Sequence, residues 1–261
     1  MTADVDSHNG GTAEMRPWHL VAISAGTSEP STTRMLADRI AQRSLESLQD
    51  MEPTRPAPSA GVIELAPLAV EIARATVSGL PSGDLRAAIE QIAGADALIA
   101  STPVYKAGIS GLFKSFVDFL DNDLLIAKPV LLAATAGSSR HALVADEQMR
   151  PLFAYMRALT LPTSVFAAPE DWSTSELGER IARAATELAV LVHARIEQRI
   201  AERAWSGYQH QFAGNATRAE QSAADIDFDS PLMRLAAGGN TTPAAADSHP
   251  GTPTSGITQS G

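Results

Sequence analysis

A loop predicted over residues 102–111 (TPVYKAGISG) carries residues that could bind a flat ring. Pro103 fixes its own φ and biases Thr102 towards an extended conformation, and two glycines leave room for a rigid ligand to approach the backbone. Tyr105 offers an aromatic face or a hydroxyl, and Lys106 offers a cation. On spacing alone, a plain Gly/Pro turn explains these residues equally well.

A second stretch, AGTSEPSTT over Ala25–Thr33, could bind an anion. It follows an apolar strand and precedes a helix, so backbone N–H groups and the helix dipole would favour negative charge there. Its serine and threonine hydroxyls add neutral donors. A simple helix cap at Ser31 or Thr32 is the equally weighted alternative. The stretch has neither the G-x-x-x-x-G-K-[ST] nor the G-x-G-x-x-G pattern.

A third small-residue loop, TAGSSRH, follows the strand at Val130–Ala134. Gly137 and Ser138 could present N–H groups to the polar edge of a ring. His141 is the histidine that the sequence places beside this loop, although a lone histidine is more often structural or exposed than functional.

The elements that position these loops alternate between short apolar strands and amphipathic helices. The predicted strands are His19–Ser24, Gly61–Leu65, Ala97–Ser101, Val130–Ala134 and Thr163–Ala167. The predicted helices are Thr32–Leu48, Leu68–Thr76, one from the cap Asp84 to Ala93, one beginning at Leu112, and Ser175–Ile200. This order predicts an α/β fold with a five-stranded parallel sheet, which gathers the three loops at the carboxyl edge.

Composition excludes several classes of function. The 261 residues carry a formal net charge of −10, which gives no basic surface for nucleic acid or anionic lipid. The chain has no cysteine, and it shows neither a secretory signal nor an apolar run long enough for a membrane span. We therefore expect a cytoplasmic protein with no nucleic-acid or membrane partner and no metal cluster.

Domain boundaries follow from shifts in composition. Residues 1–17 are polar, and residues 207–261 are dominated by Gly, Ala, Thr, Ser and Pro, with one apolar island, FDSPLMRL, over Phe228–Leu235. Such segments bury too little apolar surface to offset their ordering entropy. We expect a disordered N-terminus, a folded domain over residues 18–206 and a disordered tail.

Two separated motifs resemble the NADPH-dependent FMN reductase family of flavodoxin-like proteins. One is Thr102-Pro103-Val104-Tyr105-Lys106 with Ser110-Gly111 and Lys114; the other is Thr135-Ala136-Gly137-Ser138 with His141, Arg150 and Pro151. The resemblance covers about Leu20–Leu188 and is nearest to the reductases of two-component alkanesulfonate and luciferase-like monooxygenase systems. It implies a flavodoxin-like three-layer sandwich.

The resemblance also implies roles for individual residues. The FMN phosphate would be held by Ser24, Gly26, Thr27, Ser28, Ser31, Thr32 and Thr33. The ribityl chain and one side of the ring would meet Thr102, Pro103, Val104, Tyr105 and Lys106, and the pyrimidine edge would meet Ala136, Gly137, Ser138 and His141. NADPH or NADH would pass a hydride directly to the flavin, with no catalytic acid or base from the protein.

As a whole, the resemblance implies a homodimer or homotetramer that supplies reduced flavin to a luciferase-like monooxygenase. The phosphate loop departs from the family, because Ala25-Gly26-Thr27-Ser28 stands where many members read Gly-Ser-x-Arg, and Glu29 adds a negative charge. Ile109 likewise replaces an aromatic residue found in some alkanesulfonate-system reductases. Two alternatives stay open: a quinone or azo reductase with tightly bound FMN, and a flavodoxin-type electron carrier.

Overall fold

The computed structural model describes residues 16–205, which form one compact unit. The predicted N-terminal segment lies almost wholly outside the described residues, and the predicted tail from Gly207 does so entirely. No helix within residues 16–205 combines the length and the apolar character that crossing a membrane requires.

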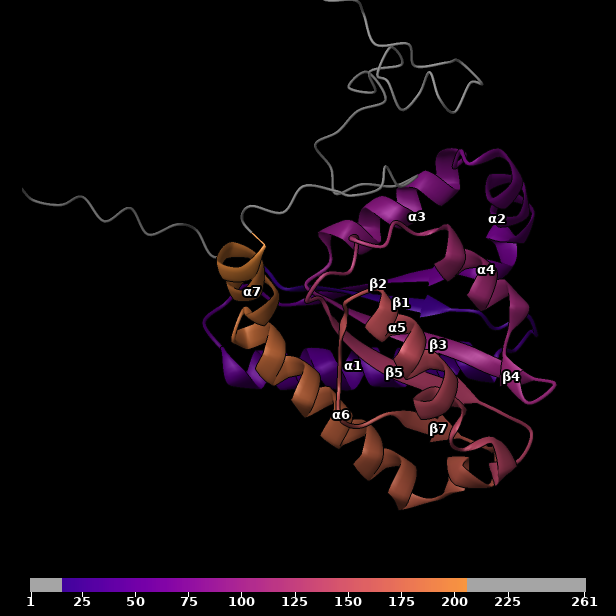
Figure 1. The fold of residues 1–261 in the computed structure, drawn as a ribbon. Helices are drawn as coiled ribbons and strands as arrows, with labels where there is room; N and C mark the ends of the chain where they lie inside the picture. Colours follow the sequence, from indigo (N-terminus) through magenta and orange to yellow (C-terminus); the bar gives the residue numbers. More distant parts are fainter. Residues whose placement is uncertain (1–15, 206–261) are drawn as a thin grey trace, which may run out of the picture. The chain divides into compact units, whose positions relative to one another are not determined.

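The central sheet has the strand order β2-β1-β3-β5-β6, and its main-path pairings are all parallel (Figure 1). Its strands are β1 (His19–Ser24), β2 (Ser59–Glu64), β3 (Ala97–Tyr105), β5 (Pro129–Thr135), β6 (Leu159–Thr160) and β7 (Val165–Ala167). Since β6 and β7 pair with opposite ends of β5, they share the fifth position. The order is that of a flavodoxin-like doubly wound sheet, as predicted.

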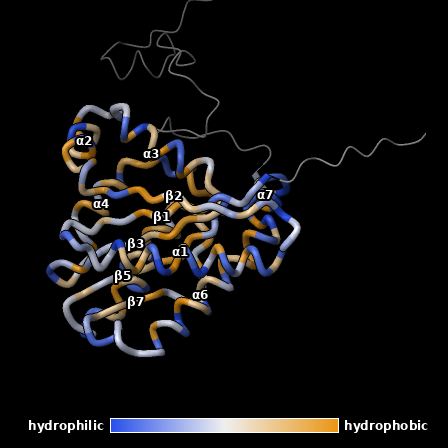
Figure 2. The backbone as a smooth tube through the Cα atoms, turned by 180° about the vertical axis from the view of Figure 1, so that it is seen from behind, coloured by the Kyte–Doolittle hydropathy of each residue, from blue (hydrophilic) through white to orange (hydrophobic). Residues whose placement is uncertain are grey.

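Helices cover both faces of the sheet. The helices are α1 (Thr32–Met51), α2 (Leu65–Ser78), α3 (Gly83–Gly94), α4 (Gly111–Phe119), α5 (Arg150–Tyr155), α6 (Ser175–His193) and α7 (Ile196–Ala204). One core joins α2, α3, α4 and α5 to the sheet face that carries Val21, and the other joins α1 and α6 to the face that carries Leu20. The structure is therefore a three-layer sandwich. In Figure 2 the apolar colour lies along the strands, while α1 alternates between apolar and polar residues.

The burial of the three inner strands explains why they could be recognised in the sequence. Strands β1, β3 and β5 are covered on both faces, so their residues are apolar almost without interruption. Pairing in register brings Ser24 opposite Ser101 and Pro103 opposite Thr135. The loops that follow β1 and β5 therefore leave the sheet at the same edge as the end of β3.

The predicted loop over residues 102–111 is wrong in its first half. Strand β3 continues through Tyr105, turns at Lys106 and Ala107, and pairs antiparallel with β4 (Gly108–Ile109). Because β1 ends opposite Ser101 and β4 pairs only with Val104 and Tyr105, Pro103 has a strand partner only in β5, and a proline that lacks an N–H is tolerated there.

Two helix predictions also need correction. Ser82, not Asp84, is the residue before α3, and Asp84 lies in the first turn, where its charge still complements the helix dipole. The predicted helix Ser175–Ile200 is two helices, because Arg195 adopts a left-handed conformation between α6 and α7. Arg195 lies 5.8 Å from the Trp18 ring, a tertiary contact that the local sequence does not announce.

The region after β5 is more irregular than a loop followed by one helix. A 3-10 turn, η1 (Ser139–His141), precedes a π-helical segment, η2 (Ala145–Met149), which continues into α5. A further 3-10 turn, η3 (Pro169–Ser173), leads from β7 towards α6.

Candidate functional site

The loop after β1 ends at a capped helix N-terminus. The Ser31 hydroxyl accepts a hydrogen bond from the backbone N–H of Arg34 at 3.2 Å, which makes Ser31 the cap of α1. The N–H groups of the first turn have no partner inside the helix, and a 20-residue helix directs its positive dipole end towards them. Thr27, Ser28 and Thr32 are exposed beside this end and carry hydroxyls, of which that of Ser28 donates to the Pro30 carbonyl at 3.1 Å.

Gly26 and Ser31 are in close contact within this loop. A Cβ added at Gly26 would lie 1.9 Å from the Ser31 hydroxyl oxygen, so a larger residue would displace the cap. The glycine that the sequence placed in the anion loop is thus required for the position of the serine hydroxyl.

Two of the predicted phosphate-loop residues lie under the loop. The Thr33 hydroxyl is buried and hydrogen bonds to that of Thr135 at 2.7 Å, which joins α1 to β5. The Ser101 hydroxyl donates to the Thr33 carbonyl at 3.1 Å, and Ser24 is buried at the end of β1. These hydroxyls fix the floor of the site.

Arg34, in the first turn of α1, is the cation nearest in sequence to this loop, and it forms two ion pairs. Its Nε donates to Asp38 at 2.8 Å, and its Nη1 lies 3.1 Å from Glu64. The hydrogen bond to Asp38, supported by Glu64, raises the pKa of Arg34. This guanidinium is therefore paired with two exposed carboxylates, and the loop itself offers an anion mainly neutral donors.

The β3–β4 hairpin forms a second wall of the site. Val104 is half-buried, whereas Tyr105 and Lys106 are exposed at the tip. The Tyr105 hydroxyl hydrogen bonds to that of Thr27 at 2.9 Å, so the hairpin meets the loop after β1. At the base, the buried Thr102 hydroxyl accepts from the backbone N–H of Ser110 at 3.2 Å. Two of the three predicted loops thus come into direct contact.

The third loop leaves β5 at the same edge. The backbone N–H of Ala136 donates to the Ala167 carbonyl at 3.1 Å, and Gly137 is exposed with open space around it. Ser138 is extended and half-buried, and His141 ends the 3-10 turn in a half-buried position. The carboxyl edge of the sheet thus gathers neutral hydroxyls, the free N–H groups of a helix and a small-residue loop. These donors fit a phosphate and the polar edge of a flat ring.

Sequence reasoning missed Gln148, which lies in η2. Its Nε2 donates to the Ala107 carbonyl at 3.0 Å, and its Oε1 accepts from the backbone N–H of Ile109 at 3.1 Å. This side chain therefore links the segment after β5 to the hairpin. No local pattern could have revealed a contact between residues 41 positions apart.

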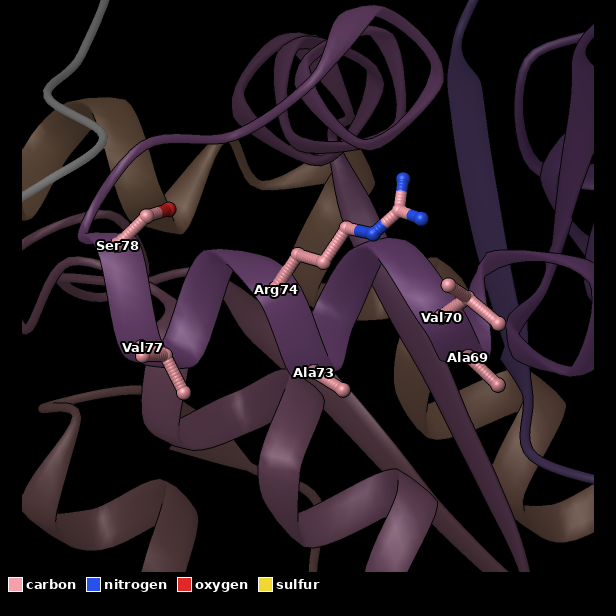
Figure 3. A pocket seen from close by; sticks show the side chains of 6 residues that line it. All are labelled: Ala69, Val70, Ala73, Arg74, Val77 and Ser78. Atoms are coloured by element: carbon pink, nitrogen blue, oxygen red, sulfur yellow. The ribbon is translucent and has the colours of Figure 1, made fainter.

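A surface hollow on α2 is separate from the predicted site. Figure 3 shows its lining side chains, all from α2: Ala69, Val70, Ala73, Arg74, Val77 and Ser78. The hollow is shallow, and Val77 is 90% exposed. Because α2 begins at the carboxyl end of β2, these later turns lie away from the three loops. Its lining is mainly apolar, with Arg74 and Ser78 as its polar members, and none of the three predicted loops contributes to it.

Comparison with known proteins gives consistent matches. A family described as NADPH-dependent FMN reductase matches residues 18–173, which is more than half of the chain. The NADH-dependent FMN reductase SfnE of Pseudomonas putida is 43% identical over 183 residues, covering 67% of this chain and 91% of that protein. The FMN reductase (NADPH) of Pseudomonas aeruginosa is 38% identical over 186 residues, covering 69% and 96%.

Solved structures agree with the sequence matches. An oxidoreductase from Corynebacterium diphtheriae is 42% identical, with a TM-score of 0.65 over 70% of this chain and 99% of its own. The apo form of the NADH:FMN oxidoreductase EMOB is 29% identical, with a TM-score of 0.58 over 66% of this chain and 89% of its own.

Proposed function

The chain belongs to the NADPH-dependent FMN reductase family, and from this premise we propose that it supplies reduced flavin to a partner monooxygenase. It is an oxidoreductase that uses FMN and NAD(P)H. The partner that we propose is a flavin-dependent monooxygenase of the luciferase-like class, and the assembly a homodimer or homotetramer.

The three loops have distinct tasks in this proposal. The N-terminus of α1 holds the FMN phosphate with the hydroxyls of Ser31 and Thr32 and with that of Ser28 once it turns from the Pro30 carbonyl. The hairpin that carries Tyr105 and Lys106 flanks the flavin on one side, and the loop after β5 meets its polar edge. Bound FMN supplies the chemistry by accepting a hydride from the nicotinamide. The protein positions both molecules and moves no proton itself.

The observation that carries the proposal is the way Arg34 is engaged. Because its guanidinium is paired with Asp38 and Glu64, the phosphate is held largely by neutral donors. At about 4 Å, an Arg–phosphate pair would contribute on the order of 1 to 4 kcal/mol, depending on the effective dielectric. A site without that pair should release FMN more readily than the same site with it, and a reductase that supplies another enzyme must release its product.

An anaerobic titration tests this proposal. Purified protein is mixed with a tenfold excess of FMN and with NADPH or NADH, and the loss of flavin absorbance is followed. A reductase that releases its product reduces all the added FMN in many turnovers. Reduction of no more than one equivalent per protein would instead identify a carrier or a tight flavoprotein, and the proposal would fail.

The preferred nicotinamide is tested in the same assay. The matched relatives include both NADH-dependent and NADPH-dependent enzymes, so we propose that the chain accepts NAD(P)H in general. The ratio of kcat/KM for the two coenzymes at saturating FMN then gives the preference directly.

A further inference from the structure

The turn of the β3–β4 hairpin has an unusual composition for its geometry. Val104 pairs with Ile109 and Tyr105 with Gly108, so Lys106 and Ala107 form a two-residue turn. Both turn residues have positive φ, 50° and 64°, which is the type I′ conformation. That turn strongly prefers Asn-Gly, because a residue with a Cβ is strained in the left-handed region. A contact from outside the turn would help to offset this strain.

Gln148 is placed to do this. Its amide donates to the carbonyl of Ala107 and accepts from the N–H of Ile109, so it contacts the backbone on both sides of Gly108. A Cβ at Gly108 would lie 3.1 Å from Gln148 Oε1, so the glycine lets the amide approach the backbone. Gln148 itself sits in a π-helical segment, a type of irregularity that is frequent at functional sites.

The hairpin is tied on its other side as well. The hydroxyl of Tyr105 meets that of Thr27, in the loop after β1. The strained turn thus lies between a contact to the first loop and a contact to the segment that follows the third. A change in the turn would move Tyr105 and Lys106 relative to both.

We propose that Gln148 is a positioning residue for flavin binding: its amide holds the Lys106–Ala107 turn in the conformation that places Tyr105 and Lys106 against FMN. The inference rests on the proposed function, because it takes the three loops as the flavin site. Gln148 acts through the turn and touches neither FMN nor the nicotinamide.

The test is a double-mutant cycle on the full-length protein. Gln148→Ala should weaken FMN binding about fivefold. The change removes two hydrogen bonds, and solvent-exposed hydrogen bonds contribute little net free energy. In the Ala107→Gly background only Lys106 keeps a Cβ in the left-handed region, so the turn needs less external support and the same change should cost less than twofold. Affinity is measured by quenching of flavin fluorescence, and KM for FMN should rise with little change in kcat.

A second readout reports the contact itself. Hydrogen exchange at the Ile109 amide should accelerate in Gln148→Ala. Gln198→Ala is the matched control, because Gln198 is also a helical glutamine whose amide donates a hydrogen bond, in its case to the Glu202 side chain at 2.7 Å on α7. It should alter neither the exchange rate at Ile109 nor the affinity for FMN.

The outcomes separate this inference from the proposed function. If wild-type protein reduces excess FMN while Gln148→Ala binds FMN normally, the positioning role is wrong and the proposed function stands. An equal loss in both backgrounds would likewise exclude action through the turn. If Gln148→Ala does not fold, Gln148→Glu replaces it. That variant keeps the acceptor for the Ile109 N–H but loses the donor to the Ala107 carbonyl. Its loss of FMN affinity must also be smaller in the Ala107→Gly background.

Discussion

Ser31 has two tasks at the start of α1. Its oxygen accepts the N–H of Arg34, which satisfies one of the free donors of the helix, while its own hydrogen stays available for a phosphate oxygen. The position of this oxygen in turn depends on Gly26. Gly26 and Ser31, which the sequence placed in the same anion-binding loop, are therefore coupled through one contact.

Replacing Ser31 by Ala should affect stability and binding separately. Loss of a helix cap costs about 1 kcal/mol of unfolding free energy. Loss of a donor to a charged phosphate costs about 1.5 to 3 kcal/mol, or roughly 10- to 150-fold in FMN affinity. Riboflavin has no phosphate and should lose far less, and equal weakening of FMN and riboflavin would contradict the assignment of this loop.

Gly26→Ala tests the coupling to Ser31. Its Cβ would lie 1.9 Å from the Ser31 hydroxyl oxygen, so the change should destabilise the wild-type protein by about 1 to 3 kcal/mol. In a Ser31→Ala background that oxygen is gone, and the remaining contacts, at 3.1 and 3.2 Å, are tight but closer to tolerable. Urea unfolding should therefore show a smaller loss there, whereas strictly additive losses would show that the contact is unimportant.

At the scale of elements, the hairpin carries stored backbone strain. A left-handed conformation costs a residue with a Cβ about 1 to 2 kcal/mol, and glycine loses about 0.5 to 1 kcal/mol more entropy on folding. Ala107→Gly should therefore stabilise the protein by about 0.5 to 1 kcal/mol. Urea unfolding should show this gain as a higher midpoint concentration.

The matched control for that change is Ala142→Gly. Ala142 is also exposed, but its φ of −57° and ψ of −27° are right-handed. This substitution should lower stability by about 0.5 to 1 kcal/mol. Loss of stability in both variants would mean that the turn at Ala107 is not strained.

The elements differ in how far the sequence could predict them. Strands β1, β3 and β5 were evident as apolar runs bounded by small residues, and α1 as an amphipathic repeat. The hairpin was missed because Lys-Ala is not a recognisable turn sequence. The break at Arg195 was missed because neither Gly nor Pro marks it, and Gln148 was missed because its partners are distant in sequence.

At the scale of the molecule, strand alternation and the two motifs were sufficient to predict a parallel, flavodoxin-like sheet and the edge where the three loops gather. Sequence alone could not show which hydroxyls face outward, because burial of Thr33 and Ser24 depends on contacts with strands far along the chain. It also could not show that Arg34 is engaged by Asp38 and Glu64, one of which lies at the end of another strand.

The composition of the C-terminal region leads to a prediction about the whole chain. Deleting residues 207–261, which carry little apolar sequence apart from Phe228–Leu235, should leave the melting temperature and FMN affinity nearly unchanged. Both are measured on the truncated and full-length proteins under the same conditions. A large loss of either would show that this region packs on the folded domain.

The most direct test of the central claim is whether FMN behaves as an exchangeable substrate. We expect protein that purifies largely colourless, binds added FMN at around micromolar, and oxidises NAD(P)H at a rate that saturates with free FMN. A yellow preparation that keeps its flavin through extensive dialysis, and whose turnover requires a quinone but no added FMN, would contradict the account.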